Sequence, residues 1–233
     1  MAIIVLAHGA WSAAWAWKKM RPLMAAAGHE FLAPSYTGLG ERAHLASPNN
    51  DLDTHIQDLL GVLKFENLRN VVLVGHSYGG SVITEAGADP KVSALVYVAA
   101  LQPDVGEASG QLLSKFAAPN DAMRATPDKY FYLPPAKFHE NFAADVSPSE
   151  AQFMADSQDP LAEKALGAQV SVAAWRTKPS YAILTTQDHM VSPQLQRWMY
   201  QRSGAKVTEV SASHAVFISQ PAAVAQVIEA AAK

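Results

Sequence analysis

The segment VVLVGHSYGGSV, residues 71–82, constrains the fold of this chain most strongly. Its opening apolar run is typical of a strand buried on both faces of a sheet. The run leads directly into GHSYG (75–79), after which apolar residues recur at helical spacing. Glycines have no Cβ atom, so they allow a strand and the next helix to approach closely around a sharp turn. The pattern predicts that Ser77 projects above the sheet as a nucleophile. The alternative is a turn that contains a serine without chemistry.

Strand-like and helix-like segments alternate along most of the chain. Strands that are connected through helices favour right-handed crossovers, and these produce a mostly parallel sheet with helices on both faces. We therefore predict the α/β class. The predicted strands are 3–9, 30–35, 70–75, 93–101, 180–186 and 205–211, and the predicted helices are 13–28, 52–66, 78–88, 193–203 and 220–232.

Residues 102–178 break this alternation. They contain several prolines and many aromatic residues but no convincing strand, and a segment of this length needs structure of its own. We interpret it as a helical cap inserted between two strands of a core formed by 1–101 and 179–233. Its aromatic residues either line a substrate pocket, for which Phe116 and Phe153 are candidates, or fill a small core within the cap.

Composition excludes several classes of protein. The chain has 233 residues, of which 49% are hydrophobic and 17% charged, and its formal net charge is −3. Without a basic patch, we expect no nucleic-acid partner, and without an apolar run of about eighteen residues we expect no membrane span. The absence of cysteine excludes disulfides, thiolate metal sites and a cysteine nucleophile. The N-terminus lacks the charged region of a signal peptide, so a cytoplasmic location is expected.

A serine hydroxyl needs a base to take its proton. Among eight histidines, His214 is the best candidate because it follows the last predicted strand and precedes the last helix. The chain order expected for this type of turn is serine, acid, histidine. Asp188, at the end of the strand YAILTT, fits as the acid that orients the imidazole. Asp104, one strand earlier, is the alternative acid.

A tetrahedral intermediate needs two N–H donors for its oxyanion. We expect one from Tyr78, the residue after the serine, and one from Ala10 in the loop after the first strand. Trp11 in the same loop either lines the pocket or covers the loop. In GERAHL (40–45), Arg42 or His44 either meets a substrate carboxylate or forms a local ion pair with Glu41.

These residues carry a family resemblance over nearly the whole chain. The motifs VLAHGAW, AAAGHEFLAP, GHSYGG, TTQDHMVSP and SHAVFISQP resemble the α/β-hydrolase branch that holds plant methyl-esterases, hydroxynitrile lyases and bacterial carboxylesterases. TGLGERAHL and LDTHIQDL are similar to a bacterial group with pyrethroid-hydrolysing esterases. The resemblance implies an α/β-hydrolase fold with a helical cap, no metal and no cofactor, and a homodimer as a candidate state.

The resemblance also implies site residues. It assigns Ser77, Asp188 and His214 as a catalytic triad, with Ala10 and Tyr78 as oxyanion-hole donors. The lyases of this branch carry a lysine directly after the catalytic histidine, whereas this chain has alanine there, which argues against cyanohydrin cleavage.

The predicted function is hydrolysis of small to medium-sized apolar or aryl carboxylic esters through an acyl-enzyme, with Trp11, Phe116 and Phe153 as candidate substrate contacts. Two alternatives stay open. One is a small-molecule-binding protein on the same scaffold with slow or no turnover. The other is a different reaction of the same triad, such as amide or lactone hydrolysis or perhydrolysis.

Overall fold

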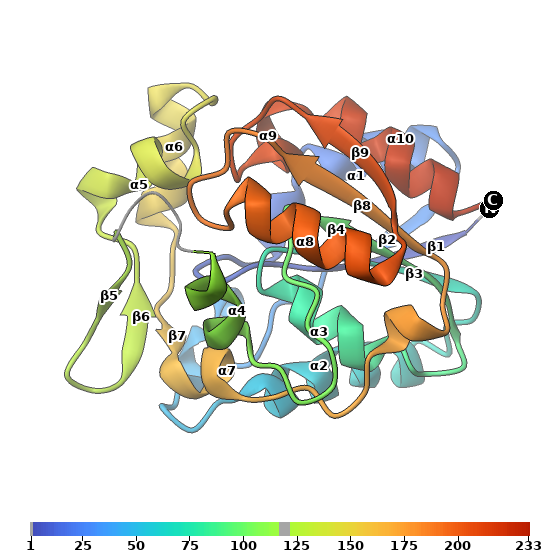
Figure 1. Cartoon of the computed structure of the whole chain (residues 1–233), viewed down its shortest axis with the longest axis horizontal. Helices are drawn as coiled ribbons and strands as arrows, with labels where there is room; N and C mark the ends of the chain where they lie inside the picture. The colour runs from blue at the N-terminus through green and yellow to red at the C-terminus, as the bar shows by residue number, and fades with distance from the viewer. Residues whose placement is uncertain (1, 117–121) are drawn as a thin grey trace.

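The computed structural model describes residues 2–116 and 122–233, and its core is a parallel six-stranded sheet (Figure 1). The strand order is β2-β1-β3-β4-β8-β9, and every neighbouring pair is parallel. All six predicted strands are present, and the predicted fold class is confirmed. The strands are β1 (Ile3–Ala7), β2 (Glu30–Leu32), β3 (Val71–His76), β4 (Val92–Val98), β8 (Ser180–Thr185) and β9 (Lys206–Val210).

Helices cover both faces of this sheet. In Figure 1, α1 and α10 lie above the sheet and α2 and α3 below it; α10 contacts β3, β4 and β8, whereas α3 contacts β3. In the part of the chain that the structure describes, every helix is too short or too polar to cross a bilayer. The core helices are α1 (Met20–Ala26), α2 (Leu52–Phe65), α3 (Gly79–Ala86), α8 (Pro193–Ser203), α9 (Val216–Ser219) and α10 (Pro221–Ala231), with short 3-10 segments at Ala14–Trp17, Gly40–Leu45 and Ala174–Arg176.

Several predicted elements are shorter in the structure by a few residues at their ends, and for 13–28 and 30–35 a proline explains the difference. The segment 13–28 is a 3-10 turn followed by α1, which starts at Met20. Pro22 has no N–H and its ring clashes with a preceding helical turn, so it is tolerated only near a helix start. Strand β2 ends at Leu32 rather than at residue 35. Pro34 cannot donate to a strand ladder.

The segment between β4 and β8 forms the cap, at the left of Figure 1. The predicted helices are present, but the expectation that the cap holds no strand is wrong, because β5, β6 and β7 form a small antiparallel sheet. Strands of two or three residues show no periodicity in a sequence; pairing with distant segments forms them. The cap elements are α4 (Ser109–Lys115), β5 (Arg124–Ala125), β6 (Tyr130–Tyr132), α5 (Pro135–Phe142), α6 (Pro148–Asp156), β7 (Leu161–Ala162) and α7 (Glu163–Gly167).

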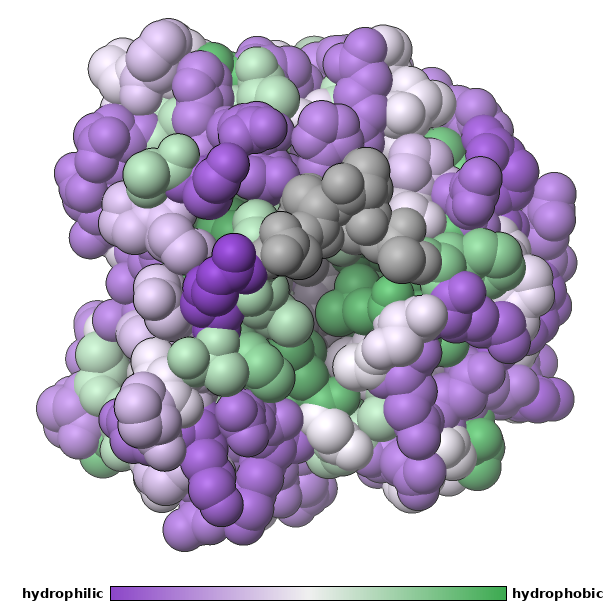
Figure 2. Space-filling view, turned by 60° about the vertical axis from the view of Figure 1, so that its left-hand side comes forward, coloured by the Kyte–Doolittle hydropathy of each residue, from purple (hydrophilic) through white to green (hydrophobic). Residues whose placement is uncertain are grey.

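The register of the sheet brings several strand ends to one edge. Ala7 at the end of β1 pairs with Gly75 of β3, and Gly75 pairs with Tyr97 of β4. The loops that follow these strands therefore leave the sheet side by side, beneath the cap. On the face that carries the cap, hydrophobic residues gather near the centre and hydrophilic residues surround them (Figure 2).

Candidate active site

The turn between β3 and α3 holds Ser77 in a strained conformation. Its φ angle is +53°, in the left-handed region, which costs a non-glycine residue roughly 1–3 kcal/mol. A Cβ atom on Gly75 would lie 2.6 Å from the carbonyl oxygen of Gly79, and one on Gly79 would overlap the carbonyl of Ala7. Only glycine allows β3 and α3 to approach this closely, so the turn presents the serine hydroxyl above the sheet edge.

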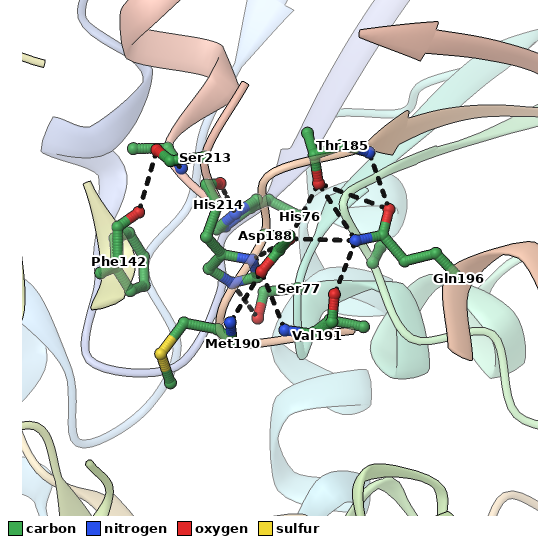
Figure 3. A network of polar contacts seen from close by, with 12 residues as sticks. His76, Ser77, Phe142, Thr185, Asp188, Met190, Val191, Gln196, Ser213 and His214 are labelled. Carbon is green, nitrogen blue, oxygen red and sulfur yellow. Dashed lines mark hydrogen bonds and ion pairs between the residues drawn. The ribbon is translucent and has the colours of Figure 1, made fainter. Parts of the chain in front are cut away.

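His214 connects Ser77 to Asp188 (Figure 3). The Nε2 atom of His214 lies 2.8 Å from Ser77 Oγ, and its Nδ1 atom lies 2.7 Å from Asp188 Oδ2. A carboxylate accepts hydrogen bonds, so Nδ1 carries the proton and the Nε2 lone pair faces the serine hydroxyl. His214 and Asp188 are each 1% exposed. The structure thus brings all three predicted triad residues together in a geometry that can take a proton from the serine.

Asp188 accepts four further hydrogen bonds. Its Oδ2 atom receives the Thr185 hydroxyl at 2.8 Å and the Gln196 side-chain amide at 3.0 Å. Its Oδ1 atom receives the backbone N–H groups of Met190 and Val191 at 2.8 and 2.9 Å. A buried carboxylate is costly unless it is hydrogen-bonded, and these donors supply that compensation while fixing the orientation of the carboxylate.

Gln196 was not among the residues that the sequence pointed to. It is fully buried on α8, where its amide also reaches the carbonyl of Val191 at 2.8 Å and its oxygen accepts from Thr185 N–H at 3.0 Å. Its neighbours on the same helix, Leu195 and Met199, are buried and apolar. The sequence feature that could have identified it is a glutamine among apolar positions of a predicted helix. A glutamine on the buried face of a helix requires polar partners inside the protein.

Ala10 and Tyr78 lie where the sequence placed them, beside the serine. Both line the cavity above Ser77. Tyr78 immediately precedes α3, so its N–H belongs to the free donors at a helix N-terminus. Among the described residues, neither the Ala10 nor the Tyr78 N–H donates to a protein acceptor. Both donors are therefore available to a substrate oxygen.

Two buried histidines near this turn are held neutral. Burial lowers the pKa of His8 to about 3, and its Nε2 accepts the Tyr36 N–H at 3.1 Å. Burial, and secondarily the charge of His214, lowers the pKa of His76 well below its usual value. The His76 Nε2–H donates to the His214 carbonyl at 2.9 Å, and the two rings are 4.6 Å apart. A neutral His76 adds no repulsion when His214 takes up a proton.

A third buried histidine, His55, forms a hydrogen bond with the side chain of Tyr78. His55 Nδ1 lies 2.9 Å from the Tyr78 hydroxyl, and its Nε2 donates to the Thr37 carbonyl. Burial lowers the pKa of His55 to about 4 and raises the pKa of the Tyr78 phenol well above its usual value. The phenol therefore stays protonated and donates to His55, which fixes the side chain of a residue that lines the cavity.

The alternative candidates lie in ion pairs elsewhere. Asp104 binds Arg176 through two guanidinium contacts of 2.9 and 2.5 Å, and this pairing lowers the pKa of the carboxyl group. Arg42 pairs with Asp58 at 2.7 Å, so the expectation that Glu41 is its partner is wrong. Glu41 instead accepts a hydrogen bond from a serine hydroxyl. Neither Arg42 nor His44 is among the residues that line the cavity.

Ser77 opens into a cavity of about 710 Å³ between the core and the cap. Its lining is largely apolar, which suits a small organic molecule. No group of three histidine or carboxylate side chains within 2–116 and 122–233 is arranged to hold a metal ion. The described lining residues are Ala10, Trp11, Ser77, Tyr78, Leu101, Gly110, Leu113, Ser114, Met123, Arg124, Phe131, Glu163, Leu166, Gly167, His189, Met190 and Val191.

Of the three predicted aromatic substrate contacts, only Trp11 lines this cavity. Phe116 packs against Trp198, with ring centres 6.1 Å apart. Phe153 is 44% exposed and stands edge-on to Trp15 on the outer side of α6. The predictions for Phe116 and Phe153 are therefore corrected: the packing of the cap turns both rings away from the cavity.

Of two other cap aromatics, Phe131 of β6 lines the cavity, whereas Phe142 packs against His214 and is not among the described lining residues. Phe142, at the end of α5, stands edge-on to the His214 ring with centroids 4.8 Å apart. Both were visible in the sequence as members of an aromatic-rich insertion, but the sequence carries no sign of which rings face inward.

The comparisons with known proteins agree with this geometry. A model of the alpha/beta hydrolase family matches residues 4–227, so the chain belongs to that family. Over 122 residues it is 47% identical to a carbendazim hydrolyzing esterase of Nocardioides sp. (strain SG-4G), a match that covers 51% of this chain and 50% of that protein. It is also 29% identical over 211 residues to methylesterase 8 of Arabidopsis thaliana, covering 84% of this chain and 75% of that protein.

The fold is shared with a pyrethroid hydrolase from Sphingobium faniae JZ-2. The TM-score is 0.82 at 21% identity, over 99% of this chain and 97% of the other. The match with the carbendazim hydrolyzing esterase spans only half the length of that relative. The family resemblance and the α/β-hydrolase fold predicted from the sequence are confirmed.

Proposed function

We propose that this protein is a serine carboxylesterase that hydrolyses small to medium-sized apolar or aryl esters. One observation carries the proposal: Ser77 Oγ, His214 and Asp188 are connected at 2.8 and 2.7 Å, and Ser77 opens into an apolar cavity. The names of the relatives, which are esterases and methylesterases, support an ester as the substrate.

In the acylation step, Ser77 Oγ attacks the ester carbonyl carbon while His214 Nε2 takes the hydroxyl proton. The carbonyl electron pair moves to oxygen, and the N–H groups of Ala10 and Tyr78 bind the resulting oxyanion. When the tetrahedral intermediate collapses, its C–O bond to the alcohol breaks. The alcohol leaves with the proton from His214.

Deacylation repeats these steps with water. His214 Nε2 takes a proton from water, and the hydroxide oxygen attacks the acyl carbon. Collapse of the second intermediate returns the proton to Ser77 and releases the carboxylic acid. Asp188 holds Nδ1 throughout and stabilises the transient imidazolium.

The cavity supports the choice of substrate size and polarity. Its volume of about 710 Å³ lies within the range of pockets for small organic ligands. Leu113, Leu166, Met190 and Phe131 supply apolar surface, which favours alkyl or aryl groups on either side of the ester.

Hydrolysis of p-nitrophenyl esters of graded acyl length tests the proposal. We expect wild-type turnover, and a loss of at least about 10³-fold in Ser77→Ala, because no other group in the site replaces the nucleophile. Ser149→Ala, at an exposed serine of α6, is the matched control and should retain wild-type turnover. Wild-type rates in Ser77→Ala would overturn the assignment.

A further inference from the structure

The side chain of Trp11 connects the loop after β1 to the small sheet of the cap. The indole N–H of Trp11 donates to the carbonyl oxygen of Phe131 at 2.8 Å. Phe131 lies on β6, which pairs with β5 and β7 in the small cap sheet. The hydrogen bond therefore spans 120 residues of sequence and joins the proposed oxyanion loop to the cap.

The backbone of Trp11 needs such a connection. Its φ angle is +60°, in the left-handed region that favours glycine and is an outlier for a bulky residue. A strained conformation persists only where surrounding structure holds it. Trp11 directly follows Ala10. Rotation about this φ would turn the Ala10–Trp11 peptide, shift the Ala10 Cα and, through it, displace the neighbouring Ala10 N–H.

The Trp11 ring also contacts a second part of the cap. It is 94% buried, with 6% of its surface exposed, and it stands edge-on to Phe142 at a centroid distance of 6.5 Å. Phe142 in turn contacts the His214 ring. A single side chain thus contacts the β6 and α5 segments of the cap while its backbone forms part of the loop beside Ser77.

We propose that Trp11 is a positioning residue: through its indole hydrogen bond to Phe131, the cap holds the Ala10 N–H in the orientation that forms the oxyanion hole. The inference rests on the proposed function, because it assigns Ala10 as an oxyanion donor. The cap then has a role beyond enclosing substrate. It completes the part of the core that stabilises the transition state.

Trp11→Phe tests this inference, because it keeps an aromatic ring but removes the N–H. We expect kcat for a p-nitrophenyl ester to fall roughly 10- to 100-fold, somewhat less than for deletion of an oxyanion donor. KM should change less than about threefold. Affinity for a trifluoromethyl ketone, which adds to Ser77 to form an oxyanion, should fall by the same factor as kcat/KM. The corresponding methyl ketone, which reports ground-state binding, should bind with unchanged affinity.

Trp15→Phe is the matched control. Among the described residues, the Trp15 indole N–H has no hydrogen-bond partner, although the residue lies only four positions further along the chain. Removing that N–H should leave kcat and trifluoromethyl ketone affinity unchanged. Equal losses in Trp11→Phe and Trp15→Phe would indicate a general effect of tryptophan replacement and would contradict the inference.

Trp11→Gly separates the effect of the indole hydrogen bond from the effect of the strained Trp11 backbone. Glycine adopts the +60° conformation freely, but it carries no indole to hold the loop. We expect kcat to fall at least as far as in Trp11→Phe, with a circular dichroism spectrum that matches the wild type. Full activity in either folded variant would overturn the positioning role. Absence of both turnover and ketone adduct in the wild type would instead overturn the proposed function, so the two failures are distinguishable.

Discussion

The cavity has two walls that are built differently. The core wall consists of the lining residues from 1–101 and 179–233, such as Ala10, Ser77 and Met190, and the cap wall consists of those from 102–178, such as Leu113, Phe131 and Leu166. The core wall carries the proposed proton-transfer groups. Among these, Asp188 accepts hydrogen bonds from Thr185, Gln196 and two backbone N–H groups in addition to His214. In the part of the chain that the structure describes, the cap wall contributes mainly apolar surface, which includes the ring of Phe131. Under the proposed function, the core therefore sets the reaction and the cap sets the choice of substrate.

The two walls are nevertheless joined close to the reacting groups. Trp11 donates to the Phe131 carbonyl. A second contact joins the hydroxyl of Ser213, directly before His214, to Asp145 in the loop after α5. The cap therefore contacts both the proposed oxyanion loop and the loop that carries the imidazole.

The largest effect should come from the core wall. Asp188→Asn replaces an acceptor by an amide that can donate to Nδ1, which places the imidazole proton on Nε2 and removes the base. We expect kcat to fall about 10⁴-fold with little change in folding. Ester turnover and circular dichroism measure the two effects.

Asp104→Asn is the control for that substitution. Asp104 belongs to a partly exposed ion pair with Arg176, so its loss should change stability little and leave kcat within about twofold. A larger loss of kcat in Asp104→Asn than in Asp188→Asn would reverse the assignment of the acid.

A smaller effect should appear in the pH dependence of stability. Folded His8 has a pKa of about 3, whereas in the unfolded chain its pKa is the usual histidine value of 6.5. Between about pH 3 and the usual histidine pKa of 6.5, the unfolded state therefore binds more protons than the folded state. The stabilising contribution of neutral His8 is complete above pH 6.5 and is lost as the pH falls toward 3.

His8→Gln should make this dependence shallower by about 1.4 kcal/mol per pH unit in the same interval. Glutamine can still accept from Tyr36 N–H and donate to the Gly9 carbonyl, the two contacts that His8 makes. Urea unfolding at a series of pH values measures the slope. Parallel curves for wild type and variant would show that His8 does not carry the linkage.

The smallest effect should come from the cap wall. Phe131→Leu keeps the backbone carbonyl that accepts from Trp11 but reduces aromatic contact in the cavity. We expect KM for aryl esters to rise by roughly three- to tenfold, with kcat within about twofold, because a modest loss of apolar contact weakens binding without touching the proton relay.

Phe153→Leu, at an exposed cap position outside the cavity lining, should leave both constants unchanged. An equal KM increase in Phe153→Leu would restore the substrate role that the sequence suggested for Phe153. A fall of kcat in Phe131→Leu as large as that in Asp188→Asn would remove the distinction between the two walls.

The sequence predicted the core far better than the cap. Long apolar runs such as β3 predict a buried strand. Because strand ends in a parallel sheet meet at a common edge, Ser77, Asp188 and His214 could be placed together from their positions after strands. In the cap, β5 and β7 have two residues each, and no local pattern specifies them. The cytoplasmic location and the homodimer stay predictions.

By itself, the sequence determined the α/β class, the serine turn and the chain order of the candidate triad, because each depends on local spacing and on the geometry of strand ends. Only the tertiary structure decided that Gln196 supports Asp188, that Phe131 rather than Phe153 faces the cavity, and that Trp11 reaches the cap. These contacts join residues from different elements. Their orientation follows from packing, which no local pattern records.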